Sequence, residues 1–108
     1  MPLKIERSRT DDGVVIAVAG EVDLYTSREL RTAILDAVPK DSRTLAIDLG
    51  RVAYMDSSGV ATLIEGLKRA GQTGATFVLV SPSSAVMKVL QLSRLDTVFV
   101  IRQDAAHP

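Results

Sequence analysis

Short apolar runs rich in β-branched residues alternate along this chain with longer segments in which apolar residues recur at helical spacing. The runs are GVVIAVAG, TLAIDL, ATFVLV and TVFVI. Continuous apolar runs of this length are typical of strands buried in a parallel sheet. In the segments between them, apolar residues recur at i, i+3, i+4 and i+7, the spacing of one helix face. Because strands alternate with helices, we expect mostly parallel pairing, right-handed crossovers and helices packed over the sheet.

The N-terminal segment LKIERSRT alternates apolar and polar side chains, as a half-exposed strand does. Asp11-Asp12-Gly13 follows it and indicates a hairpin turn, which places this strand antiparallel to the next at the sheet edge. The predicted fold class is therefore α/β, a small mixed sheet of about five strands with helices packed on it. The 108 residues suit a single domain spanning 1–108, with an ordered core at about 3–102 and a polar tail at 103–108.

Three helices are predicted from apolar stripes and their caps. The first begins at Thr26, which forms a T-x-x-E capping box with Glu29. The expected limits are Thr26 to Pro39 for the first helix, Ser57 to near Gly71 for the second, and Ser83 or Ser84 to Leu90 for the third. The apolar faces that pack on the sheet are expected to include Leu30, Ile34, Val60, Leu63, Ile64 and Leu67.

Composition argues against several function classes. The chain has 13 basic and 13 acidic residues, so it lacks the strong positive field that sequence-independent nucleic-acid binding needs, and we expect no nucleic-acid partner. It has no cysteine, which excludes disulfides, thiolate metal sites and thiol nucleophiles. The acidic residues are dispersed without ligand spacing, so neither a metal site nor a cofactor is expected.

No sequence feature indicates association with a membrane. The N-terminus MPLKIERSRTDD has no apolar signal core, and no apolar run approaches the roughly 20 residues that span a bilayer. We therefore expect a soluble, cytoplasmic protein without a membrane partner.

Parallel pairing brings the loops after successive strands to one rim of the sheet, where open α/β sheets usually place their sites. Three polar loops are expected to meet there: Gly20 to Asp23, Asp56 to Gly59, and Ser81 to Ser84.

The segment Asp56-Ser57-Ser58-Gly59 has two interpretations. Asp and Ser directly before a helical stripe are good N-cap residues, because a side-chain oxygen accepts an otherwise unpaired N–H of the first turn. A hydroxyl at a helix N-terminus also faces convergent N–H groups and the positive end of the helix dipole, which would hold a phosphate placed on that hydroxyl. Helix caps are far commoner than such sites, but a phosphorylatable serine fits the same residues.

The sequence does not indicate an enzyme. A hydrolytic serine is not supported, since the elbow G-x-S-x-G is absent and the only histidine, His107, lies next to the last residue. Neither G-x-x-x-x-G-K-[ST] nor G-x-G-x-x-G occurs, so the chain has no phosphate-cradling loop of its own. Any ATP would have to come with a partner, and no catalytic residue is assigned.

Two segments resemble the STAS-domain anti-sigma-factor antagonists. In GEVDLYTSREL and the later AIDLGRVAYMDSSGVATLIEGLKRA, a G-E-x-D segment precedes one helix and a D-S-S-G segment opens the next, as in that family. The resemblance covers nearly the whole chain and implies a single STAS domain. It also implies that the first serine of D-S-S-G, Ser57, is phosphorylated. The partner-binding residues implied around it are Asp23, Asp56, Ser57, Ser58 and Gly59.

The same resemblance implies partner switching in bacterial transcription regulation, of the kind that governs stress responses or sporulation. Such a protein, when unphosphorylated, binds an anti-sigma factor that is also a serine kinase; when phosphorylated on Ser57, it releases that partner, and a serine phosphatase resets it. The C-terminal RQDAAHP is too short for the longer final helix of many members. The alternative is a constitutive STAS subunit of a transport or signalling assembly, in which D-S-S-G is only a cap. The oligomeric state stays open.

Overall fold

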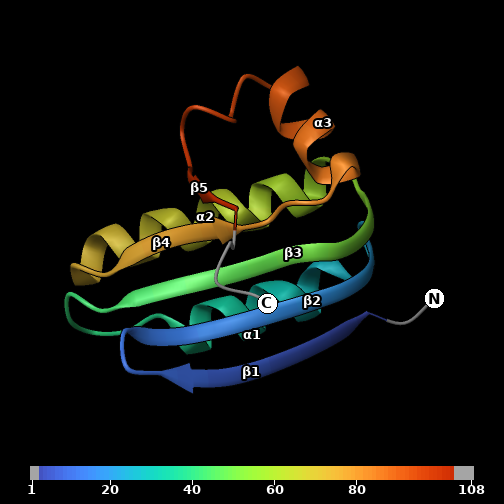
Figure 1. Cartoon of the computed structure of the whole chain (residues 1–108). Coiled ribbons are helices and arrows are strands. Elements are labelled where there is room, and N and C mark those ends of the chain that lie inside the picture. Colours follow the sequence, from blue (N-terminus) through green and yellow to red (C-terminus); the bar gives the residue numbers. More distant parts are fainter. Residues whose placement is uncertain (1–2, 104–108) are drawn as a thin grey trace.

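A mixed sheet of five strands in the order β1-β2-β3-β4-β5 forms the centre of the molecule (Figure 1). The computed structural model describes residues 3–103. The strands are β1 (Lys4–Thr10), β2 (Gly13–Val22), β3 (Thr44–Met55), β4 (Thr76–Val80) and β5 (Val100–Arg102). The helices are α1 (Ser27–Ala37), α2 (Ser57–Thr73) and α3 (Ser84–Leu92). Only β1 pairs antiparallel, through the predicted hairpin, so the predicted α/β class with a mixed sheet is confirmed.

The hydrophobic core lies between one face of the sheet and the two longer helices, which run behind the strands in Figure 1. Alternate residues of β3, among them Ile47 and Leu49, point into this core, where they meet fully buried helix residues such as Leu30 and Leu63. The strands follow one another in sequence order, and right-handed crossovers between such strands place α1 and α2 on the same face. The predicted helix faces are therefore confirmed at Leu30, Ile34, Val60, Leu63, Ile64 and Leu67.

The run GVVIAVAG is buried on one face only, which corrects the expectation of a fully buried strand. Ile16 and Val18 of β2 are buried against the helices, whereas Ala17 and Ala19 on the other face are half-buried. The reason lies in the topology, because a sheet whose strands follow in sequence order has no crossover helix on its second face.

Helix ends differ from the sequence prediction at three places. The capping box at Thr26 does not form, since this residue has helical backbone angles (φ −83°, ψ −20°) and its side chain caps no N–H of α1. Helix α2 continues past Gly71 to Thr73 and ends at Gly74, whose left-handed φ of 82° suits glycine. Ser83 caps α3 by accepting the N–H of Val86 at 3.3 Å, and this helix extends to Leu92.

The predicted fifth strand and tail are only partly described. Of TVFVI, just Val100 and Ile101 lie in β5, while Phe99 precedes the strand and is buried. The polar tail expected at 103–108, including His107, falls outside the described residues from 104 onward. Through Arg102 the chain forms the single α/β domain that the sequence predicts.

Strand β3 is much longer than its neighbour β4, and this difference shapes the rim. The pairing of β3 with β4 begins at Thr44 and Thr76 and ends at Asp48 and Val80. Beyond that point β3 continues to Met55 alongside β2 only. The N-terminus of α3 closes the freed edge of β3, because Ser83 donates its N–H to the carbonyl of Leu49 at 3.2 Å and its hydroxyl to the carbonyl of Val52 at 2.6 Å.

Candidate functional site

Asp56 is the residue that caps α2 in the D-S-S-G segment. Its backbone is extended, and its Oδ1 accepts the N–H of Ser58 at 3.0 Å. Its main-chain carbonyl accepts the N–H groups of Gly59 at 3.1 Å and Val60 at 3.2 Å. The N–H groups of residues 58 to 60 are thus already bonded to Asp56, so a phosphate on Ser57 would not find them free. A phosphate on Ser57 would therefore compete with Asp56 for these three N–H groups, and the expectation that the first turn holds the phosphate stays a prediction.

The two serines of the segment have different surroundings. The Ser58 hydroxyl donates to Oδ1 of Asp56 and is half-buried. Ser57 is exposed, and its hydroxyl makes no hydrogen bond to any residue between 3 and 103. Of the two hydroxyls, that of Ser57 is therefore the one accessible to a reactant from solution.

Asp23 folds its carboxylate back onto its own loop. Its Oδ1 accepts the N–H groups of Tyr25 at 2.9 Å and Thr26 at 3.0 Å. The N–H of Thr26, helped by that of Tyr25 and by the Thr26 hydroxyl, lowers the pKa of Asp23 below its usual range. Thr26 itself accepts the N–H of Asp23 at 2.9 Å and donates its hydroxyl to the carbonyl of Glu21 at 2.8 Å. These bonds explain why Thr26 forms no capping box: its hydroxyl is used to close the loop.

The loops after β2 and β3 lie against each other, as predicted. The N–H of Asp56 donates to the carbonyl of Val22 at 3.1 Å, next to Asp23 in the chain. Gly59 lets α2 approach both strand ends, because a Cβ there would lie 2.6 Å from Cγ of Met55 and 2.8 Å from Cγ1 of Val22. Gly59 is buried and brings α2 close to the sheet, and its expected part in partner binding stays a prediction.

The third polar loop does not join the other two. Ser81 follows the last paired residue of β4 and so lies beside the middle of β3. Ser83 contacts Leu49 and Val52, several residues before Asp56. The prediction that loops 20–23, 56–59 and 81–84 meet is therefore correct for the first two and wrong for the third, because β4 is the shorter strand.

Exposed apolar side chains lie in the loop after β2 and near the end of β3, and the sequence prediction did not include them. Leu24 is 63% exposed and Tyr25 84% exposed, and both belong to the loop that Asp23 closes. Tyr54, two residues before Asp56, is 48% exposed. For Leu24 and Tyr25, the signal that could have identified them is their place in a loop, outside any strand alternation or helical stripe; Tyr54 lies in β3. Exposed apolar groups beside polar ones are typical of protein-binding surfaces. We call Leu24, Tyr25, Tyr54 and Ser57 the rim surface.

The site offers a surface and not an enclosed centre for chemistry. Among residues 3–103 no group of acidic or histidine side chains is arranged to hold a metal ion. Over the same residues no helix is long and apolar enough to cross a membrane. What the rim surface presents, within residues 3–103, is an unbonded hydroxyl at a helix N-terminus and exposed apolar side chains in the neighbouring loop after β2 and in β3.

Fold and site together define the class: a small α/β domain whose candidate site lies at the carboxyl ends of two strands, β2 and β3. Residues 5–102 match the family model described as Mlab, STAS domain. An anti-sigma-B factor antagonist of Listeria monocytogenes is 31% identical over 103 residues, which cover 94% of this chain and 90% of that relative. The chain therefore belongs to the STAS domain family, the family of the anti-sigma-factor antagonists.

Solved structures agree with this assignment. An anti-sigma factor antagonist from Mycobacterium paratuberculosis has a TM-score of 0.82 at 25% identity and covers 96% of this chain and 88% of its own. The Bacillus cell fate determinant SpoIIAA in its phosphorylated form has a TM-score of 0.71 at 24% identity and covers 95% of both chains.

Proposed function

We propose that this chain is an anti-sigma factor antagonist whose binding is switched by phosphorylation of Ser57. Unphosphorylated, it binds an anti-sigma factor that is also a serine kinase; phosphorylated, it releases that partner until a serine phosphatase resets it. The observation that carries the proposal is the difference between the two serines: the Ser57 side chain is exposed and makes no hydrogen bond among the described residues, whereas Asp56 accepts the hydroxyl of Ser58. The relatives named as anti-sigma factor antagonists support the choice of partner.

The rim surface supplies a physical basis for the switch. A phosphoserine carries about 1.5 to 2 negative charges at neutral pH. Docking of Leu24 and Tyr25 on a partner would bury apolar area next to Ser57, and a phosphate there would have to be desolvated or repelled. Asp56 already uses the N–H groups of residues 58 to 60, so the helix end cannot fully compensate that cost. The role requires no catalysis by this chain, since the kinase brings its own ATP, and it is carried out in the cytoplasm.

The test begins with the kinase partner, ATP and three proteins: wild type, Ser57→Ala and Ser58→Ala. Intact-mass and peptide mass spectrometry should show one phosphate on wild type and on Ser58→Ala, and none on Ser57→Ala. Labelling that survives Ser57→Ala and vanishes in Ser58→Ala would show that the assignment is wrong by one position. Absence of phosphate from every protein, with partner binding intact, would favour the constitutive STAS subunit.

Affinity measurements complete the test. Calorimetric titration of the partner should show at least about a tenfold loss of affinity, or roughly 1.4 kcal/mol, on phosphorylation of the wild-type protein. Tyr25→Ala should weaken binding of the unphosphorylated form by a similar factor without lowering the thermal midpoint, because this side chain is almost fully exposed. Arg28→Ala, on an exposed residue of α1, is the matched control. Equal affinities of wild type and Tyr25→Ala would remove Tyr25 from the docking surface.

A further inference from the structure

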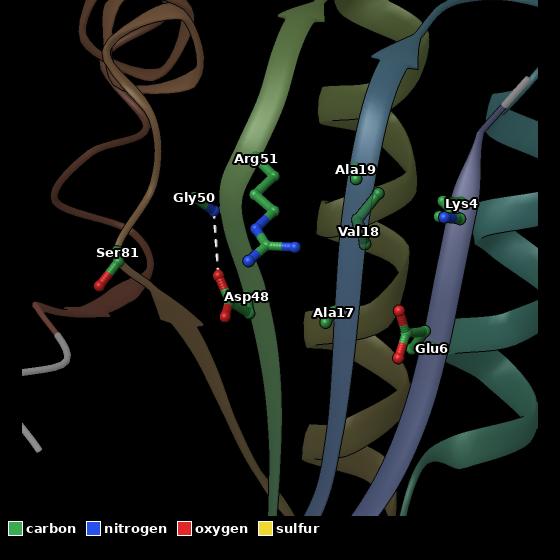
Figure 2. A pocket seen from close by; sticks show the side chains of 9 residues that line it. All are labelled: Lys4, Glu6, Ala17, Val18, Ala19, Asp48, Gly50, Arg51 and Ser81. Carbon is green, nitrogen blue, oxygen red and sulfur yellow. Dashed lines mark hydrogen bonds between the residues drawn. The ribbon is translucent and has the colours of Figure 1, made fainter. Parts of the chain in front are cut away.

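The face of the sheet opposite the helices contains a hollow of about 530 Å³ across β1, β2 and β3 (Figure 2). Ala17 and Ala19 of β2 form its floor, with Gly50 of β3 also in its lining, and Figure 2 shows charged side chains of β1 and β3 on either side of the two alanines. A hollow of this volume is within the range of sites for small molecules. It lies on a different surface from Ser57, and nothing in the proposed function uses it.

The strand register arranges the charges in two rows of opposite sign. In one row, Ala19 pairs with Lys4 on β1 and with Arg51 on β3. In the next row on the same face, Ala17 pairs with Glu6 and Asp48. Each small side chain therefore lies between two like charges: two cations around Ala19 and two anions around Ala17.

A β-bulge in β3 is what places Arg51 in this arrangement. Regular alternation would put Arg51, three residues after Asp48, on the helix-covered face. The register between β2 and β3 shifts between Ala17 and Ala19, so that Leu49 and Gly50 together oppose Val18. Oδ1 of Asp48 accepts the N–H of Gly50 at 3.0 Å across this bulge. Bulges commonly re-aim a side chain next to a site, and here the bulge turns a guanidinium toward the hollow.

The charged side chains that line the hollow do not form ion pairs with one another. Within residues 3–103, Lys4, Glu6 and Arg51 make no ion pair or hydrogen bond through their side chains, although opposite charges lie on neighbouring rows. Ser81, at the border of the hollow, has a left-handed φ of 45°, a conformation that non-glycine residues adopt at a cost and that recurs at functional sites. The alanine floor and the glycine in the lining, in strands that otherwise favour β-branched residues, keep the space between the rows open.

We propose that this hollow binds a small zwitterion of the length of a dipeptide. The carboxylate lies between Lys4 and Arg51, and the ammonium group lies between Glu6 and Asp48. Rows two residues apart on a strand are separated by about 7 Å, close to the distance between the two charged ends of an extended dipeptide. Arg51 binds a carboxylate well because its planar fork donates two parallel hydrogen bonds.

The test uses L-alanyl-L-alanine as the probe, followed by backbone chemical shifts of the full chain. Shifts should move at residues 4–6, 17–19 and 48–51, and the dissociation constant should lie below about 1 mM. N-acetyl-alanyl-alanine lacks the ammonium and alanyl-alanine amide lacks the carboxylate, so each should bind at least tenfold more weakly. Equal binding of the three compounds, or no shift change with 10 mM alanyl-alanine, about tenfold above the expected limit, would overturn the proposal.

Substitutions of the residues that line the hollow test whether the dipeptide binds there. Arg51→Gln and Glu6→Gln should each weaken dipeptide binding at least tenfold, and Ala17→Leu should abolish it by filling the floor. Arg28→Gln, on α1 and away from the hollow, is the matched control and should bind like wild type. Ser57→Ala should also bind like wild type, which separates this proposal from the proposed function. If Arg51→Gln and Glu6→Gln, with wild-type chemical shifts elsewhere, keep full affinity, the hollow is not the site.

Discussion

The N-cap of α2 yields the sharpest quantitative prediction, because Asp56 there combines two separable effects, a hydrogen-bonding cap and a negative charge. Asp56→Ala removes the oxygen that accepts the N–H and the hydroxyl of Ser58. Loss of a good N-cap costs about 0.5–2 kcal/mol of unfolding free energy. Asp56→Asn keeps an acceptor of nearly equal capping strength, so we expect its stability to stay within about 0.5 kcal/mol of wild type.

Phosphorylation of Ser57 should make Asp56→Asn more stable than wild type, although the unmodified proteins are nearly equal in stability. The phosphate and the Asp56 carboxylate are on adjacent residues, and the N–H groups of residues 58 to 60 are already bonded to Asp56. The phosphate on Ser57 carries up to two negative charges. At about 6 Å from the Asp56 carboxylate, in surroundings close to water, these charges repel the carboxylate by about 1.4 kcal/mol. Salt reduces this repulsion. We therefore expect phosphorylated Asp56→Asn to be about 1 kcal/mol more stable than phosphorylated wild type at low ionic strength.

Urea denaturation measures all six proteins: wild type, Asp56→Asn and Asp56→Ala, each with and without phosphate on Ser57. Equal slopes of free energy against urea would show that only stability has changed. The charge-repulsion mechanism would be refuted if phosphorylated Asp56→Asn were no more stable than phosphorylated wild type. It would also be refuted if the difference in unfolding free energy between them were the same in 0.5 M salt. Unmodified Asp56→Ala as stable as wild type would show that the capping bonds contribute nothing.

Two further predictions concern the core and the helix pair. Leu63→Ala should cost about 2–5 kcal/mol of unfolding free energy, because this side chain is fully buried between α2 and the sheet; a loss below about 1 kcal/mol would be incompatible with its burial. Arg31 donates to both carboxylate oxygens of Glu65 at 2.9 and 2.8 Å and lowers the pKa of Glu65 below its ordinary value of 4.5. A lowered carboxyl pKa stabilises the fold above the unfolded value and loses this effect as pH falls through the folded value, so the stability difference between wild type and Arg31→Gln should be present at pH 7 and shrink below pH 4.5. A difference that stays constant down to pH 2.5 would mean that packing, and not charge, is responsible.

The succession of elements could be predicted from the sequence because it depends on local periodicity. The strand-like runs, the apolar stripes through Leu30 and Leu63 and the hairpin at residues 11 to 13 all involve neighbours along the chain. The capping box failed for a local reason too, since Asp23 and Thr26 use their side chains to close the preceding loop and leave none for the cap. A four-residue pattern does not show which of two hydrogen-bond networks a threonine joins.

Features set by pairing between distant segments could not be predicted. Loop 81–84 lies away from Asp56 because β4 ends opposite Asp48, and the sequence of β4 alone does not reveal where β3 continues. The bulge at Leu49 and Gly50, which reverses the face of Arg51, is likewise visible only in the register between β2 and β3. One inserted residue changes which side chains share a face, so charges that appear unrelated along the sequence meet across the sheet.

The D-S-S-G segment allows two interpretations from its sequence, a helix cap or an accessible serine, but it has one conformation in the structure. Any of its three polar residues is chemically able to cap a helix. The bond from the N–H of Asp56 to the carbonyl of Val22 ties that residue to the end of β2 and holds its backbone extended, so Asp56 becomes the cap. Ser58 then lies within reach of the cap's carboxylate, and Ser57, one position earlier, is exposed and its hydroxyl bonds to nothing in the described part of the chain. Capping and an accessible hydroxyl are therefore not alternatives here, since the cap at Asp56 is what leaves Ser57 free.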